Sequence, residues 1–162
     1  MRIHRKLFWL VACGLVLGLT ASAQSRKAGL YEVTSTMTWQ KSPFPGMMAH
    51  MGRKPHTTKV CVTQAEIDKY GTTPPRTQRD CKVENVVKKA NGMTAEMVCT
   101  GAMAGKGDIQ ASWTDATHTT TKVHYVGAMK MGSESKPIEW TVQSSSIYEG
   151  ADCGKVKPMK VK

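Results

Sequence analysis

The most distinctive chemistry in this sequence is carried by Met47, Met48, His50 and Met51, which lie within five residues of each other. Thioether sulfurs favour Cu(I), and imidazole also suits copper. Prolines and glycines break the surrounding segment, residues 43–55, which we therefore predict to be a loop that could wrap an ion, with His56 as a further ligand. The alternative is an apolar lid over the open end of a sheet, because methionine packs adaptably.

Three tryptophans form a second candidate group. Trp39, Trp113 and Trp140 each fall on the predicted inward face of a strand. They either pack in the core or, if the sheet is a cup, line a ligand cavity together with Phe44. The sequence leaves both interpretations open.

No catalytic motif accompanies these residues. G-x-S-x-G, H-E-x-x-H and paired catalytic acids are missing from the sequence, and the glycine-rich stretch 101–107 lacks the Gly-Lys-Ser/Thr ending of a phosphate-binding loop. If the cysteines pair, no free thiol is left as a nucleophile. We therefore expect a protein without catalytic activity and without a cofactor, apart from a possible Cu(I) ion.

Beyond the first 23 residues, the sequence contains four cysteines: Cys61, Cys81, Cys99 and Cys153. An even number in an exported chain indicates two disulfides, for which three connectivities exist. Residues 82–88 and 93–98 flank an Asn-Gly pair, which is typical of a hairpin turn, here with a loop of four or five residues. Such a hairpin places Cys81 opposite Cys99, so we predict this bond and, with it, Cys61–Cys153.

The elements that must position these residues are mostly short strands. Alternating patterns predict strands over 29–39, 57–62, 108–114, 117–126 and 136–148, besides the hairpin. Thr63 and Glu66 form a capping-box pattern, which predicts a short helix over 64–70. Residues 100–107 read as a glycine-rich connection. The expected fold is all-β, an antiparallel meander curled into a barrel or half-barrel.

The N-terminus has the three parts of a secretory signal peptide over residues 1–23: a basic start, an apolar run of about 13 residues, and small residues at Ala21 and Ala23. That run is too short to span a membrane, which takes about 20 residues, and no span is expected elsewhere. A lipoprotein box ending at Cys13 is the weaker alternative, because the apolar run continues beyond it. We predict one β domain over 24–154 and a basic tail over 155–162.

The chain carries a formal charge of +11. Lys155, Lys157, Lys160 and Lys162 concentrate part of it in the tail, which suits anionic lipid headgroups of a cell envelope. Nucleic acid fits poorly outside the cytoplasm. The expected partner is a small ligand or an envelope component, and the expected state is a monomer.

Several motifs in order resemble a known family: Gly29-Leu-Tyr-Glu-Val-Thr, Cys61-Val-Thr-Gln-Ala-Glu, Asp80-Cys81, Met97-Val-Cys-Thr-Gly101 and Gly-Ala-Asp-Cys153. Together they resemble domain-of-unknown-function family 3617, small exported proteins of Gram-negative bacteria, over about residues 29–154. The resemblance implies a periplasmic location and supports two disulfides, but it implies no activity. We therefore expect a periplasmic accessory module that binds a ligand or partner at the open end of the sheet, with Cu(I) binding or envelope binding through the tail as alternatives.

Overall fold

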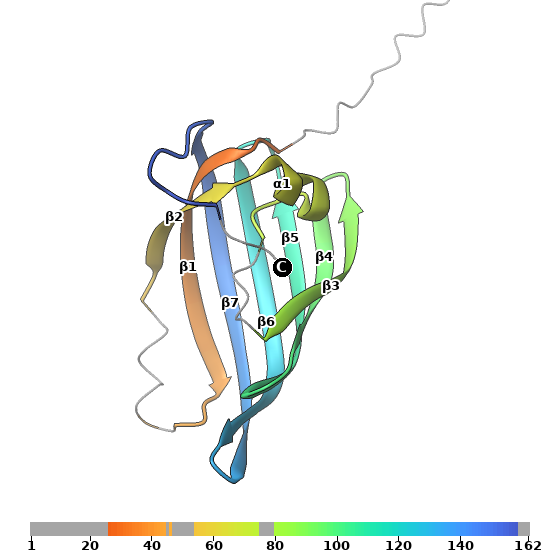
Figure 1. Ribbon diagram of the computed structural model, residues 1–162, viewed down its shortest axis with the longest axis vertical. Helices are drawn as coiled ribbons and strands as arrows, with labels where there is room; N and C mark the ends of the chain where they lie inside the picture. Colours follow the sequence, from red (N-terminus) through yellow and green to blue (C-terminus); the bar gives the residue numbers. More distant parts are fainter. Residues whose placement is uncertain (1–25, 45, 47–53, 75–79, 159–162) are drawn as a thin grey trace, which may run out of the picture.

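The structure, a computed structural model, describes residues 26–44, 46, 54–74 and 80–158. These residues form one seven-stranded sheet and one short helix (Figure 1). The elements in chain order are β1 (Gly29–Lys41), β2 (His56–Val62), α1 (Gln64–Tyr70), β3 (Cys81–Lys89), β4 (Gly92–Cys99), β5 (Met103–Trp113), β6 (His118–Met131) and β7 (Glu134–Gly150).

The strands follow the order β2-β1-β7-β6-β5-β4-β3, and every neighbouring pair is antiparallel. Strands β3 to β7 are a meander joined by hairpins, and the N-terminal β1 pairs with β7. The sheet curls into an open half-barrel whose edge strands, β2 and β3, do not pair with each other. This confirms the all-β meander and the half-barrel form of the prediction.

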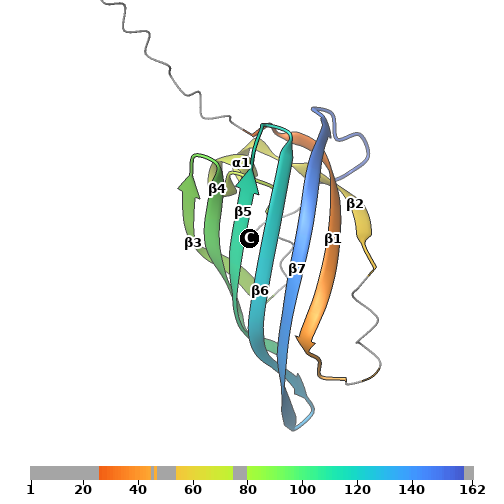
Figure 2. The ribbon, with the colours of Figure 1, turned by 180° about the vertical axis from the view of Figure 1, so that it is seen from behind.

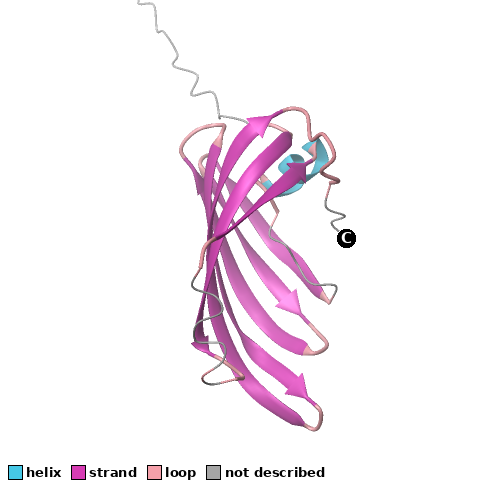
Figure 3. Cartoon of the chain, turned by 90° about the vertical axis from the view of Figure 1, so that its left-hand side faces the viewer, coloured by secondary structure: helices cyan, strands magenta, loops and turns pink. Residues whose placement is uncertain are grey.

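Helix α1 lies on the concave side of the sheet, and the strands bend toward the side that carries it (Figure 3). The capping box forms as predicted: Thr63 caps the first turn, and the Glu66 carboxylate accepts from the Thr63 backbone N–H at 2.7 Å. Gly71 ends the helix with φ 72°, a left-handed conformation that favours glycine. The helix therefore begins and ends where local chemistry dictates.

The same helix joins two apolar clusters on the concave face. Ile67 packs with Tyr31, Val60 and Val62 near the β2 edge. Tyr70 belongs to the larger cluster, whose other buried members are Met93, Ala95, Met97, Cys99, Ile109, Ala111, Trp113, Val123, Tyr125 and Ile138. Because one short helix contacts both clusters, it closes one end of the half-barrel.

Both predicted disulfides are present. Cys81 and Cys99 are register partners in the β3–β4 hairpin and are bonded, and Cys61 is bonded to Cys153. The chain after Cys153 returns to the sheet, because Pro158 forms a parallel bridge with Cys61. This part of the predicted basic tail is thus attached to β2.

The β3–β4 turn is tighter than the predicted loop of four or five residues. Lys89 pairs directly with Gly92, which leaves Ala90 and Asn91 as the turn. The end of β5 holds this turn: the Trp113 backbone N–H donates to the Asn91 carbonyl and its indole Nε1 to the Ala90 carbonyl, both at 3.1 Å. The hydrogen bonds from β5 stabilise this shorter turn, and the local sequence around the turn contains no sign of them.

The expected glycine-rich connection over 100–107 is also wrong for most of its length. Strand β5 already begins at Met103, and Gly105 and Gly107 are paired strand residues. The ring of Tyr125 on β6 lies against them: a Cβ on Gly105 would stand 2.8 Å from the Tyr125 hydroxyl. These glycines make room for an aromatic ring and do not form a flexible connection.

Residues 1–25 lie outside the described part, so the signal peptide over 1–23, with Cys13, stays a prediction. Within the described residues, no helix is long and apolar enough to cross a membrane.

Candidate ligand-binding cavity

A cavity of about 240 Å³ opens on the concave face of the half-barrel. Four neighbouring strands, β2, β1, β7 and β6, supply most of its wall, and Met97 of β4 reaches it from across the sheet. The segment after α1 covers it with Thr73 and Pro74. The complete lining is Val33, Ser35, His56, Thr58, Val60, Thr73, Pro74, Met97, Thr121, Val123, Trp140, Val142, Ser144 and Ser146.

Because register partners share a face, the wall is made of rows that cross the strands and differ in chemistry. Ser35, Ser144 and Thr121 are partners across three adjacent strands and form a hydroxyl row. Val142 and Val123 are partners in the next row on the same face. The cavity therefore offers an apolar surface crossed by a line of small hydroxyl groups.

A stacked aromatic pair forms one part of the cavity wall. Trp140 stacks on Tyr125 with ring centroids 5.0 Å apart and planes inclined by 16°. Tyr125 is fully buried, and its hydroxyl donates to the Met103 carbonyl at 3.0 Å. Burial raises the pKa of Tyr125 above its ordinary value, which keeps the phenol protonated as a donor. The buried and hydrogen-bonded Tyr125 ring therefore holds the Trp140 ring in place.

One buried polar atom of a wall residue lacks a hydrogen-bond partner within the described part of the protein. The Thr73 hydroxyl is buried yet has no hydrogen-bond partner among the described residues. Leaving such a group unpaired costs about 1–3 kcal/mol. The oxygen has almost no accessible surface, so it is closed off from a ligand in the cavity as well as from water.

The four aromatic residues predicted to line a cavity separate in the structure. Trp140 lines it. Trp39 is opposite Trp140 in the sheet and packs, partly buried, against the large cluster. Trp113 lies under the helix end, because Tyr70 and Gly71 cover it, and so belongs to the core. Phe44 follows β1, where its backbone N–H donates to the Ser42 hydroxyl, and is not part of this wall.

The predicted Cu(I) ligands Met47, Met48, His50 and Met51 lie outside the described residues, so copper binding stays a prediction. His56, the suggested further ligand, begins β2 and lines the cavity. The described residues contain no group of three or more His, Cys, Asp or Glu side chains that could hold a metal ion. In the tail, Lys155 and Lys157 are exposed, while Lys160 and Lys162 are not described.

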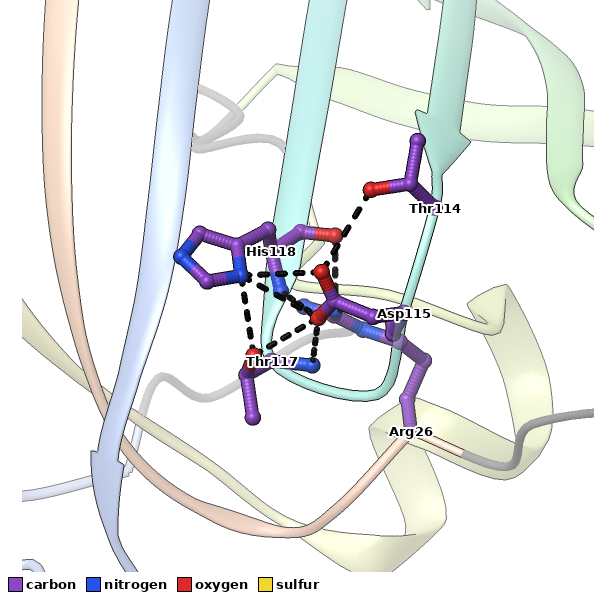
Figure 4. Close-up of polar contacts among 5 residues, drawn as sticks. All are labelled: Arg26, Thr114, Asp115, Thr117 and His118. Carbon is purple, nitrogen blue, oxygen red and sulfur yellow. Dashed lines mark hydrogen bonds and ion pairs between the residues drawn. The ribbon is translucent and has the colours of Figure 1, made fainter.

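A polar cluster that the sequence analysis missed closes the β5–β6 hairpin (Figure 4). The Asp115 carboxylate accepts from the backbone N–H groups of Thr117 at 2.6 Å and His118 at 2.8 Å, and also from the Thr117 hydroxyl. These bonds hold the pKa of Asp115 far below its ordinary value. The sequence contains the pattern that predicts this turn, because an aspartate at the start of Asp-Ala-Thr-His is typical of a turn capped by its side chain.

Arg26 joins this cluster from the N-terminal segment. Its Nη1 donates to the carbonyls of Asp115 at 3.3 Å and His118 at 3.0 Å, and its guanidinium lies 5.3 Å from the Tyr31 ring centroid. Burial lowers the pKa of Arg26, although a guanidinium keeps its charge at any ordinary pH. Arg26 therefore ties the chain before β1 to the far end of the β5–β6 hairpin.

Comparison with known families gives one match. A family model described as a protein of unknown function (DUF3617) matches residues 26–153. The matched region runs from Arg26 to Cys153 and includes both disulfides and all seven strands. No curated protein and no solved structure matches the chain.

Proposed function

The chain belongs to the DUF3617 family, and we propose that its half-barrel is a non-enzymatic binding module that takes the apolar part of a small ligand into the concave cavity. The observation that carries this proposal is a cavity wall that combines apolar side chains, Trp140 among them, with the hydroxyl row of Ser35, Ser144 and Thr121. Ligand sites of this kind are mostly apolar, with a few polar groups that orient the ligand.

The size and chemistry of the cavity define the class of ligand. At about 240 Å³ it is smaller than the roughly 300–1,000 Å³ typical of sites that enclose a whole drug-sized molecule. It therefore holds one apolar moiety, each buried methylene of which contributes about 0.8 kcal/mol. The hydroxyl row accepts a single polar group on that moiety, so the ligand is an amphiphile rather than a hydrocarbon.

The compartment we propose is the periplasm. Two disulfides are typical of oxidising compartments, and the predicted leader supplies a route of export. Cleavage after Ala23 would leave Arg26 in place, where it is needed for the contact with the β5–β6 turn. The expected state is a monomer that holds its ligand at the concave face.

Binding of the probe N-phenyl-1-naphthylamine to the exported, oxidised protein tests the proposal through the rise in probe fluorescence. Ser35→Phe fills the cavity from β1 and is expected to weaken binding at least tenfold. Thr38→Phe adds the same side chain to the same strand on the opposite face, where Thr38 is exposed, and is expected to leave binding unchanged. Urea unfolding of both variants checks that the sheet is intact.

Two results would sink this proposal. One is a folded Ser35→Phe variant that binds the probe as tightly as the unsubstituted protein. The other is the absence of probe binding, together with failure of the protein to retain any apolar ligand from periplasmic extract.

A further inference from the structure

A second hollow, which shares only Thr121 and Ser144 with the lining of the cavity, belongs to the outer face of the sheet. This is the face opposite α1, turned to the viewer in Figure 2. It is an open groove of about 910 Å³ that crosses the strands. Its lining is Thr34, Thr36, Pro55, Lys89, Asn91, Gly92, Met93, Thr94, Gln110, Ala111, Ser112, Thr120, Thr121, Lys122, Gln143, Ser144 and Ser145.

The register explains the shape of this groove. One row of partners runs Thr34, Ser145, Thr120 and Ser112, from β1 to β5. The row beside it runs Thr36, Gln143, Lys122, Gln110 and Thr94, from β1 to β4. Five neighbouring strands spaced at roughly 4.8 Å make the groove about 19 Å long. It is therefore shaped for an elongated ligand that lies across the strands.

The lining is built for hydrogen bonding. Ser112 and Thr120 hold each other at 2.8 Å, which fixes their hydroxyls while lone pairs remain to accept further bonds. Gln110 and Gln143 are exposed, and neither side-chain amide has a hydrogen bond within the described part of the chain. A row of amides and hydroxyls with free capacity matches a ligand that is itself rich in hydroxyl groups.

The charge of the groove has one sign. Lys122 lies in the middle and Lys89 at the β3–β4 end, and no acidic side chain is part of the lining. The Lys122 ammonium has no ion pair among the described residues. Acidic groups elsewhere on this face are in other rows: Asp108 and Glu96 are register partners in the row next to Lys122, and Glu32 lies in the row next to Thr34. Farther away, Glu139 contacts Lys41 and Glu149 contacts Lys59. The charged side chains of the lining itself are therefore all positive.

From these features we infer that the outer groove binds an anionic oligosaccharide, a chain of hydroxylated sugar rings that carries carboxylates. Sugar hydroxyls pair with the Thr, Ser and Gln rows, and a carboxylate receives a charge-assisted bond from Lys122.

Other ligand classes fit the same surface less well. Duplex DNA presents one negative charge per ~1.7 Å, whereas this groove offers two lysines over about 19 Å. A protein partner would need aromatic or large aliphatic anchors at the centre of the contact, and the centre of this groove is polar. A lipid tail would cover Lys122, Gln110 and Gln143 without offering their side chains a hydrogen bond.

Isothermal titration with oligogalacturonate of four to six residues tests the inference, with neutral maltohexaose as the comparison ligand. The oligogalacturonate should bind, and maltohexaose should bind at least tenfold more weakly. Lys122→Gln should weaken oligogalacturonate binding about tenfold, the loss of one charge-assisted bond worth about 1.5 kcal/mol. Lys122 is exposed between two glutamines, so the substitution should leave folding unchanged.

Lys106→Gln is the matched control, because Lys106 is an exposed lysine of β5 that lies outside the groove. Equal losses for Lys106→Gln and Lys122→Gln would show attraction to diffuse surface charge and overturn the assignment. Binding of phosphatidylglycerol vesicles without binding of oligogalacturonate would overturn it too. Naphthylamine binding in the concave cavity should be the same in all three proteins, so failure of one site is distinguishable from failure of the other.

Discussion

At the scale of single residues, Asp115 shows how one side chain can organise a whole turn. Its carboxylate accepts hydrogen bonds from two backbone amides and from the hydroxyl of Thr117, and His118 Nδ1 lies 3.0 Å from Oδ2. The carbonyls of Asp115 and His118 in turn receive the Arg26 guanidinium. The Asp115 carboxylate thus fixes the β5–β6 turn, and Arg26 joins the N-terminal segment to the backbone of that turn.

This arrangement predicts how stability depends on pH. Because the hydrogen bonds lower the pKa of Asp115 below its ordinary 3.8, its contribution is present above that pH and is lost as the pH falls. Asp115→Asn should lower the free energy of unfolding at pH 7, and the difference from the unsubstituted protein should shrink below about pH 4. Urea unfolding at pH 7, 4 and 2.5 measures it.

Asp108→Asn serves as the control for this experiment. The Asp108 side chain is exposed and has no hydrogen bond or ion pair within the described residues. Its substitution should change the free energy of unfolding by less than about 0.5 kcal/mol at each pH. A difference for Asp115→Asn that is the same at pH 7 and pH 2.5 would contradict the role of its charge.

At the scale of elements, glycines on β5 leave the space that an aromatic ring on β6 occupies. Tyr125 lies against Gly105, Gly107 and Gly127, and Trp140 of β7 stacks on its ring. The position of the cavity wall therefore depends on glycines two strands away. A glycine-rich stretch that looks like a linker in the sequence is here a rigid part of the site.

Gly105→Ala should destabilise the protein by about 1–3 kcal/mol, the usual cost of overpacking. The added Cβ would stand 2.4 Å from the Val126 carbonyl oxygen and 2.8 Å from the Tyr125 hydroxyl, so β6 or the ring must shift. Chemical denaturation measures the loss, and naphthylamine binding should weaken with it because Trp140 moves with Tyr125.

Gly150→Ala makes the same chemical change at the end of β7, where nothing lies within 4 Å of the added Cβ. It should be neutral or slightly stabilising, since alanine restricts the unfolded chain. Equal stability of the Gly105→Ala and Gly150→Ala proteins would show that the close approach at Gly105 costs nothing.

At the scale of the whole molecule, the half-barrel is open between its edge strands, β2 and β3, and contains two crosslinks that act over different distances. Cys81–Cys99 joins partners that the β3–β4 hairpin already brings together, across 18 residues. Cys61–Cys153 joins the edge strand β2 to the end of the chain, across 92 residues. The second bond therefore holds together parts that are remote in the sequence.

Removing the two bonds should have unequal effects. On the chain-entropy relation, closing 92 residues contributes about 4.6 kcal/mol and closing 18 residues about 3.2 kcal/mol. Cys61→Ser/Cys153→Ser should thus lower the free energy of unfolding by about 1.4 kcal/mol more than Cys81→Ser/Cys99→Ser. Urea unfolding of both double variants compares them, and a larger loss for the hairpin bond would argue that native packing rather than chain entropy decides.

The sequence by itself determined most of the strands, the helix and the Cys81–Cys99 crosslink, because each depends on local rules, and Cys61–Cys153 followed as the remaining pair. Period-two alternation marks the strands, and Thr63 and Glu66 mark the start of the helix. The Asn-Gly pair marks the hairpin that sets Cys81 opposite Cys99, although the turn itself is Ala90 and Asn91. The tertiary structure alone decided where the sites are. Trp113 and Trp140 have the same local pattern, yet one is covered by α1 and the other lines the cavity. The outer groove likewise exists only because register aligns polar residues from five strands, which are separated in the chain but adjacent in the sheet.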